Sequence, residues 1–163
     1  MIDEKKLSKR YAVRKLTTDD VGAVYELCRK NPLFYEYHPP FVTVGSVIED
    51  MTILPPNKTP ADKYYVGFWN GEALIAVMDI IDGYPRDGIA FIGFFMTDIS
   101  VQGRGVGSEI ISECVSYLKE CGFKRIRLGV DRSNPQSNHF WRKNRFTVDE
   151  SYVGKLIVME REI

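Results

Sequence analysis

The sequence lacks the residues from which most metal centres and disulfide frameworks are built. Its three cysteines, Cys28, Cys114 and Cys121, form no CxxC pair, and it has only two histidines, His38 and His139. Neither set has the close spacing of zinc ligands, so no metal is expected. An odd number of scattered cysteines is typical of reduced thiols in a cytoplasmic protein, which is the location that we expect.

The sequence also lacks an excess of either charge and any long apolar run. Lys plus Arg number 22 and Asp plus Glu number 22, which gives a formal net charge of zero. A basic surface for nucleic acid is therefore not expected. The charged start MIDEKKLSKR has no apolar signal region. No apolar run approaches the roughly 18 to 20 residues that span a bilayer, so no membrane partner is expected either.

What is present suffices for one globular domain over residues 1–163. The chain is 44% hydrophobic and 27% charged, and a chain of this length can bury a sizeable core. Alternating and helical spacings of apolar residues predict an α/β order of elements. Strands are expected at 11–16, 64–69, 72–81, 89–97, 124–130, 145–148 and 154–160, and helices at 17–31, 46–54, 108–121 and 134–144.

Local signals predict where some of these elements begin and end. The aromatic, proline-rich segment 33–41 is expected to be a loop. Ser46 and Glu49 fit a capping box at the start of a short helix. Asn70-Gly71 is typical of a two-residue turn in a β-hairpin.

One corner of the chain is unusually rich in glycine. The segment DISVQGRGVGSEII holds Gly103, Gly105 and Gly107 between an expected strand and an expected helix. Glycine is needed where the backbone takes a positive φ or approaches a ligand closely, and helix N-termini bind phosphates. A Walker loop is absent, and a GxGxxG fingerprint fails because its third glycine falls on Ser108. The remaining motif, QxxGxG, begins at Gln102.

With these motifs the sequence resembles the GNAT superfamily, the acyl-CoA-dependent N-acyltransferases. The element order matches along nearly the whole chain, QGRGVG resembles the pyrophosphate loop, and NPQSNHFWRKNRF resembles a second signature in which an Asn opens a helix. The resemblance implies one α/β domain with a mixed central sheet of about seven strands, flanked by about four helices. Two central strands would splay apart, with acetyl-CoA entering the gap from one side and the amine from the other.

The resemblance also implies where acetyl-CoA binds. Backbone groups at the end of the strand 89–97 would meet the pantetheine arm and the acyl carbonyl. Backbone N–H groups of the glycine loop would hold the pyrophosphate, and an Asn would contact the arm. The implied cofactor-binding residues are Phe95, Met96, Thr97, Gln102, Gly103, Arg104, Gly105, Val106, Gly107, Ser108, Asn134 and Trp141.

Few groups are implied for catalysis. The Thr97 backbone N–H would donate to the developing oxyanion. Many family members place a tyrosine seven residues after the Asn to protonate the leaving sulfur, but here that position holds Trp141, whose indole is a donor and no acid. Either Trp141 steadies the sulfur while solvent supplies the proton, or it packs, which we favour. Where members commonly have Gly, this chain has Arg145, and Asn144 is expected to take the left-handed turn instead.

The general base that accepts the amine proton has several candidates, because the strand 89–97 carries no carboxylate. Asp79 is assigned to catalysis, with Asp82 and, in the aromatic loop, Glu36 and His38 as alternative candidates for the base. The aromatic loop supplies further side chains that would border the acceptor, together with a Tyr-Pro turn. Each of these also fits a solvated charge or a packing residue. The expected acceptor-binding residues are Glu36, Tyr37, His38 and Tyr84, with Phe34 and Tyr35 as further candidates for lining the pocket.

The expected function is transfer of an acetyl group from acetyl-CoA to a primary amine of a small molecule or peptide, by direct attack in a ternary complex. The alternative is a non-catalytic acyl-CoA-binding module, favoured only by Trp141. A nucleotide-binding domain is a third hypothesis, against which the late position of the glycine loop counts. The stretch LIVMERE (156–162) could pair between chains as an edge strand, so a homodimer is left open.

Overall fold

A computed structural model describes residues 1–152 and 154–163 of the chain. Its elements are β1 (Ala12–Lys15), α1 (Val21–Arg29), α2 (Pro32–Tyr37), α3 (Val44–Thr52), β2 (Lys63–Asn70), β3 (Ala73–Asp82), β4 (Ile89–Thr97), α4 (Val106–Glu120), β5 (Arg125–Asp131), α5 (Pro135–Lys143), β6 (Thr147–Val148) and β7 (Leu156–Glu162). Among the described residues, no helix is long and apolar enough to cross a membrane. In the same part of the chain, no three His, Cys, Asp or Glu side chains gather as metal ligands would.

The seven strands form one sheet in the order β1-β2-β3-β4-β5-β7-β6. All neighbouring strands are antiparallel except β4 and β5, which run parallel. This mixed sheet confirms the expected α/β fold. The described residues form five α-helices, one more than expected, because α2 occupies most of the segment 33–41 for which a loop was predicted. Pro32 at its first position fixes a helical φ without losing a hydrogen bond.

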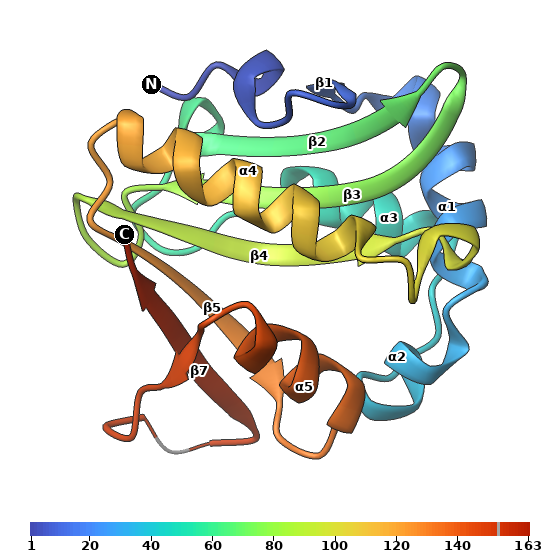
Figure 1. Cartoon of the computed structure of the whole chain (residues 1–163). Coiled ribbons are helices and arrows are strands. Elements are labelled where there is room, and N and C mark those ends of the chain that lie inside the picture. Colours follow the sequence, from blue (N-terminus) through green and yellow to red (C-terminus); the bar gives the residue numbers. More distant parts are fainter. Residues whose placement is uncertain (153) are drawn as a thin grey trace.

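Helices cover both faces of the sheet, as Figure 1 shows. On one face, α4 buries a stripe formed by Ile110, Ile111, Cys114 and Leu118, at the spacing of successive helical turns. On the other face, α1 and α3 pack against a second cluster that includes Val24, Leu27 and Val47. The neighbours Val77 and Met78 on β3 belong to opposite clusters, and each is fully buried. The strand β3 therefore separates two hydrophobic cores.

The central strands β4 and β5 separate along their length, which confirms the expected splay. They pair only from Ile89 to Ile92 on β4, although β4 continues to Thr97. Gly93 forms a bulge there, because Asp79 of β3 lies opposite Phe94 while its neighbour Ile80 lies opposite Ile92. Beyond this bulge the two strands diverge in Figure 1, with α5 following the end of β5. A gap that begins at Gly93 is thus built into the sheet.

Two local features, a capping box and a hairpin turn, lie at slightly different positions from those that the sequence predicts. The capping box of α3 is formed by Thr43 and Ser46, so the helix begins at Val44 and not at Ser46. The hairpin turn consists of the two residues after Asn70, because Asn70 itself still pairs with Ala73 in the sheet. In both cases the predicted feature is present, and its position differs from the prediction by one to three residues.

The predicted left-handed turn at Asn144 is wrong. Asn144 has a φ of −87°, and Arg145 takes the left-handed conformation with a φ of 68°. The Phe146 N–H then donates to the Trp141 carbonyl, which closes the end of α5. The Asn144 side chain is needed elsewhere, since it donates to the hydroxyl of Ser108 at 3.1 Å and ties α5 to the start of α4.

The strand β7 is not an edge strand, contrary to the expectation for LIVMERE. It lies between β5 and β6, and the edges of the sheet are β1 and β6. The short strand β6 pairs with Met159 and Glu160 and so covers part of its outer side. The expectation that β7 forms an edge of the sheet is therefore wrong, and the homodimer stays a prediction.

Candidate active site

The glycine corner connects β4 to α4 through two left-handed residues. Gly103 has a φ of 73° and Gly105 a φ of 78°, and Gly105 is the N-cap of α4. A Cβ built on either glycine would meet no atom within 4 Å. The glycines are therefore required by the backbone conformation and not by crowding. The first N–H groups of α4, which have no acceptor within the helix, follow directly after this corner.

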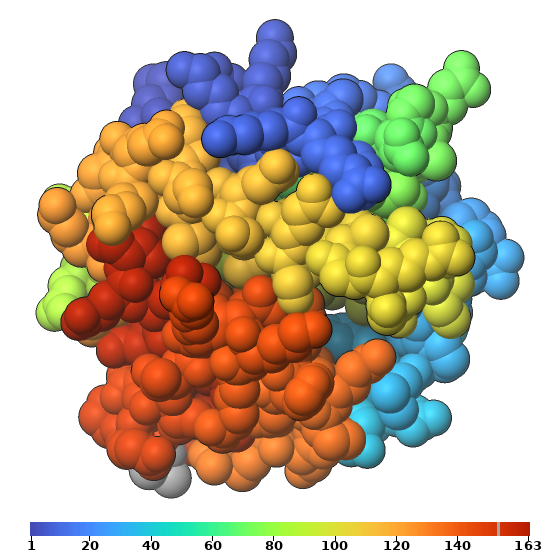
Figure 2. Space-filling model, in the orientation of Figure 1, coloured from blue at the N-terminus to red at the C-terminus, as the bar shows by residue number. Residues whose placement is uncertain are grey.

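Gly107 is required for a different reason. A Cβ at this position would lie 3.2 Å from Cε2 of Phe140 on α5. The missing side chain lets the first turn of α4 approach α5 closely. The two helices thereby form adjoining walls of one hollow, seen in Figure 2 between the yellow segment before α4 and the orange α5.

This hollow is a cavity of about 390 Å³ that runs from the glycine corner along the diverging edge of β4. Most of the residues that the family resemblance implied for cofactor binding line it: Phe95, Met96, Thr97, Gln102, Gly103, Gly105, Val106, Gly107, Ser108 and Trp141. Phe34, a candidate for lining the acceptor pocket, lines the cavity too, whereas sequence reasoning missed Asn31, Val101, Gln136, Ser137, His139, Phe140 and Lys143. Those on α5 recur every three or four residues, so helical spacing from Gln136 could have identified them.

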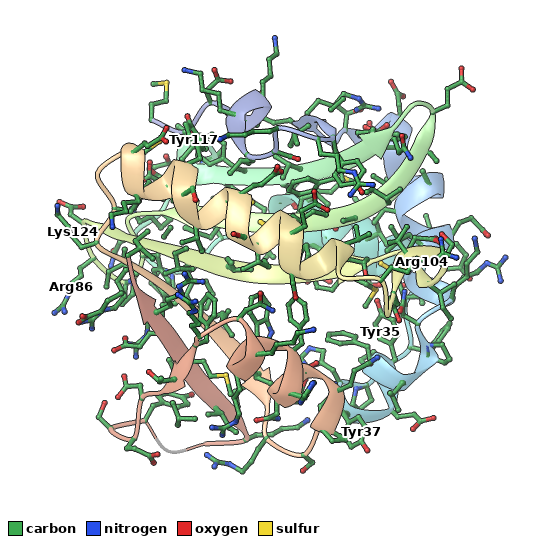
Figure 3. All side chains as sticks on the ribbon, viewed as in Figure 1. Tyr35, Tyr37, Arg86, Arg104, Tyr117 and Lys124 are labelled. Carbon is green, nitrogen blue, oxygen red and sulfur yellow. The ribbon has the colours of Figure 1, made fainter. Side chains whose placement is uncertain are left out.

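Two of the implied cofactor residues do not line the cavity. Asn134 is 1% exposed, and its side chain accepts a hydrogen bond from the Ser137 N–H at 3.1 Å, which caps α5. Arg104 is an exposed residue of the loop before α4, where it is labelled in Figure 3. The cations that do line the cavity are supplied by α5, through Lys143 and, when protonated, His139.

The backbone of β4 presents hydrogen-bond groups to the gap. The Asp98 N–H donates to the Ile75 carbonyl on the β3 side at 2.8 Å. Backbone groups of an antiparallel strand alternate in direction, so the N–H groups of Phe95 and Thr97 point to the other side, where β5 has diverged. The end of β4 therefore offers two N–H donors to a molecule in the cavity, and the Thr97 donor assigned from the sequence is one of them.

An amide cluster fixes the end of β4. The Thr97 carbonyl accepts hydrogen bonds from the side-chain amides of Asn31, at 3.2 Å, and Gln102, at 3.0 Å. Gln102 also donates to the Asn31 side-chain oxygen at 2.6 Å. Asn31 follows α1, so this cluster joins the opposite sides of the gap. No signal in the sequence links Asn31 to Gln102, because 71 positions separate them.

Trp141 lies in an aromatic cluster and also reaches the cavity. Its ring is 5.0 Å from those of Phe140 and Phe146 and 6.0 Å from that of Phe95, and the residue is 7% exposed. Such contacts hold the indole firmly in place. The favoured interpretation, a packing residue, matches this position.

Asp79 is buried in an ion pair beside the bulge. Its Oδ2 accepts a hydrogen bond from Lys63 Nζ at 2.8 Å, and among the described residues its Oδ1 has no partner. A Cβ on Gly93 would lie 2.7 Å from Oδ2, so the carboxylate fills the space that the bulge glycine leaves. Burial raises the pKa of Asp79, although the Lys63 ammonium opposes this shift. The carboxylate lies on the α1–α3 face and not among the cavity-lining residues.

The remaining acceptor candidates divide into two places. His38 follows α2, and its Nδ1 lies 2.9 Å from Oδ2 of Asp131 at the end of β5. Glu36 and Tyr37 belong to α2 as well, and Tyr37 is labelled in Figure 3. Tyr84 instead stacks edge-on against Phe91, 5.2 Å away.

Phe91 belongs to the first half of β4, at the opposite end of this strand from Thr97, which lines the cavity. Tyr84 is therefore not brought to the cavity, and Glu36, Tyr37 and His38 do not line it either. Asp82 is not brought there either, because it pairs with Ala90 in the same region.

The model of the acetyltransferase (GNAT) family matches residues 23–146. A solved acetyltransferase from Thermus thermophilus is 19% identical with a TM-score of 0.79, over 93% of this chain and 96% of that one. The PaiA N-acetyltransferase from Thermoplasma acidophilum, solved with coenzyme A, is 20% identical with a TM-score of 0.71, over 93% and 98%. A phosphinothricin acetyltransferase from Sinorhizobium meliloti, solved with AcCoA, is 15% identical with a TM-score of 0.65, over 94% and 89%. No curated protein sequence matches this chain.

Proposed function

Since the chain belongs to the acetyltransferase (GNAT) family, we propose that it transfers an acetyl group from acetyl-CoA to a primary amine of a small molecule or peptide. The observation that carries this proposal is the cavity, which joins the N-terminus of α4 to the free edge of β4. One end thus supplies unpaired helix N–H groups, and the other supplies strand N–H groups beside a gap.

The residues of the cavity fit acetyl-CoA, which supplies an acetyl group activated as a thioester. The N–H groups of Val106, Gly107 and Ser108 would hold the pyrophosphate, helped by the partial positive charge of the helix end. Lys143 on α5 lines the same cavity and adds a full positive charge. The pantetheine arm would form hydrogen bonds to the free edge of β4, in the way that an extended peptide adds a strand to the edge of a sheet.

The proposed chemistry is direct attack by the neutral amine on the thioester carbon. The C–N bond forms, the C–S bond breaks, and the sulfur leaves as thiolate. The Thr97 N–H, together with that of Phe95, stabilises the oxyanion that develops on the carbonyl oxygen. Asp79 accepts the proton that the new ammonium loses, through an intervening water. Its raised pKa makes it a better base than an exposed aspartate.

A second candidate function is a non-catalytic acyl-CoA-binding module. The observation that favours it is Trp141, which stands where many family members have an acid and is packed among three aromatic rings. A phenol is absent at this point, so sulfur protonation by this residue is not available. The thiolate is nevertheless a tolerable leaving group, since a model thiol has a pKa of about 8.5.

Thiol release from acetyl-CoA in the presence of a panel of primary amines tests the proposal. Amine-dependent release that saturates with both substrates supports transfer in a ternary complex. Tight binding of acetyl-CoA in calorimetry without release on any amine supports the binding module. Tighter binding of NAD than of CoA in the same titration contradicts both.

A further inference from the structure

The segment 31–57, which contains α2 and α3, has an unusual charge composition for this chain. It holds three acidic residues, Glu36, Glu49 and Asp50, and no Lys or Arg. The whole chain has equal numbers of acidic and basic residues. The segment that faces the gap from the α1–α3 side is therefore acidic, and it favours ligands with a positive charge over ligands with a negative one.

The same segment concentrates exposed apolar side chains. Eight large hydrophobic residues are exposed among those that the structure describes, and five of them belong to this segment: Leu33, Phe41, Val44, Ile48 and Ile53. Scattered apolar residues on a surface are normal, but a concentration on one segment marks an interaction site. The apolar residues and the acidic residues share α2, α3 and their connection.

A row of aromatic rings connects this surface to the cavity. Phe41, which is 47% exposed, lies 5.2 Å from the ring of Tyr35. Tyr35 in turn lies 5.0 Å from Phe34, in an edge-on contact. Phe34 lines the cavity and approaches Phe94 of β4 at 6.0 Å. We call Phe41, Tyr35 and Phe34 the aromatic track; Figure 3 labels Tyr35 on it.

We propose that the aromatic track binds the acceptor, and that the acceptor is a primary amine on an apolar, preferably aromatic, body without negative charge. The inference rests on the proposed acetyl transfer. The amine would reach the gap beside Phe34, and its body would lie along Tyr35 toward Phe41.

Two physical effects support this class of acceptor. Aromatic rings bind aromatic or alkyl bodies through apolar contact and edge-on ring packing. The carboxylates of the segment attract an ammonium group and repel a second carboxylate or a phosphate on the acceptor. A polar body, such as a sugar, would leave its hydroxyls against the rings and lose hydrogen bonds to water.

A matched set of acceptors tests the charge and the body separately. Phenethylamine carries the ring and one positive charge, ethylamine lacks the ring, and phenylalanine adds a carboxylate. We expect kcat/KM for phenethylamine to exceed that for ethylamine by about tenfold or more, because the ring is buried on binding. We expect phenylalanine to be slower than phenethylamine by about tenfold or more, because like charges repel. Equal or higher kcat/KM for ethylamine or phenylalanine would overturn the proposal.

A matched pair of variants tests whether the acceptor binds at the aromatic track. Phe41 and Tyr152 are equally exposed, at 47% each, so neither substitution removes a core residue. Phe41→Ala should raise the Michaelis constant for phenethylamine about fivefold, through lost apolar contact. The Michaelis constants for ethylamine and for acetyl-CoA should stay unchanged. Tyr152→Ala, in the connection before β7, should change none of the three.

The experiments distinguish failure of the proposed acetyl transfer from failure of the proposed acceptor site. If acetyl-CoA binds and no amine at all supports thiol release, the acetyl transfer itself is wrong. If amines are acetylated but Phe41→Ala leaves the Michaelis constant for phenethylamine unchanged, the transfer stands and the aromatic track is not the acceptor site.

Discussion

The two sides of the gap are built in different ways. The proposed cofactor side is a continuous stretch of chain, from Thr97 through the glycine corner into α4, and it offers mainly backbone N–H groups. The proposed acceptor side would be assembled from side chains of α1, α2 and α3, together with the ion pair of Lys63 and Asp79 on β2 and β3. Recognition by backbone requires a particular conformation, whereas recognition by side chains requires particular residues. The two sides should therefore respond differently to substitution.

The largest effect is expected from changing the backbone on the cofactor side. Gly105→Val places a β-branched residue at a φ of 78°, which costs about 1–3 kcal/mol of strain unless the loop rearranges. We expect rearrangement to misalign the N–H groups and to weaken CoA binding by about a hundredfold, or about 2.7 kcal/mol. Isothermal titration calorimetry with CoA measures the effect.

A matched control is available at the other end of α4. Gly122 has a φ of 95°, and a Cβ there would also meet no atom within 4 Å. Gly122→Val should lower the melting temperature as Gly105→Val does and leave CoA affinity intact. An unchanged affinity in folded Gly105→Val would show that the corner is not the phosphate site.

The second-largest effect is expected from removing the charge of the buried Asp79 carboxylate. Asp79→Asn should lower kcat by about a hundredfold if Asp79 is the base, while the Kd for CoA stays unchanged. In the parent protein, kcat/KM should fall as the pH drops through the raised pKa of Asp79, because only the ionised carboxylate accepts a proton. This acidic limb should be absent from the residual activity of the variant. The pH profiles of both proteins measure it.

Asp20→Asn is the matched control for a broken ion pair. Asp20 accepts two hydrogen bonds from Arg14 at 2.8 Å, at the start of α1 and away from the cavity. Its loss should reduce stability without changing kcat. A full acidic limb in Asp79→Asn would assign the base to another group.

The same contrast explains how far the sequence could predict the structure. The glycine corner, α4 and the order of the strands are local patterns, since the motif and the helical stripe lie within a few turns of chain. The helix α2 was missed because its aromatic residues and prolines are typical of a loop, and its contacts with β4, such as Phe34 with Phe94, lie far apart in sequence. Tertiary packing there overrides the local signal.

The candidate site divides in the same way. Most of the residues that the resemblance implied for cofactor binding follow from one motif, and the structure brings them to one cavity. Asn31 and Asp131 were missed because their partners, Gln102 and His38, are 71 and 93 positions away. Only the closed sheet and its helices bring such pairs together.

The third-largest effect is expected from breaking the amide cluster of Asn31 and Gln102 at the Thr97 carbonyl, which links the two sides of the gap. Asn31→Ala removes one hydrogen bond to the Thr97 carbonyl and the acceptor for Gln102. We expect kcat to fall about tenfold through about 1.4 kcal/mol of lost positioning, with KM for acetyl-CoA nearly unchanged. Steady-state kinetics with both substrates varied measure this split.

Lys30→Ala is the neighbouring control, because Lys30 is 44% exposed and lies 3.9 Å from Asp98. A long ion pair with an exposed lysine contributes little, so the kinetics of Lys30→Ala should match those of the parent. If Asn31→Ala raised both KM values equally and left kcat unchanged, the amide cluster would have no role in positioning Thr97.

The smallest effect is expected at Trp141, although it stands where the family commonly has its acid. Trp141→Phe keeps an aromatic ring among Phe95, Phe140 and Phe146 and removes the indole N–H. We expect turnover to fall less than about tenfold, or about 1.4 kcal/mol in the barrier, because solvent protonates the thiolate. Steady-state thiol release, with CoA affinity measured alongside, tests this. Trp141→Tyr introduces a phenol at the same place, and a rise in turnover would show that a proton donor can reach the sulfur. A loss of about a thousandfold in Trp141→Phe, with fold and CoA binding intact, would instead make the indole N–H a catalytic group and join this residue to the chemistry of the cofactor side.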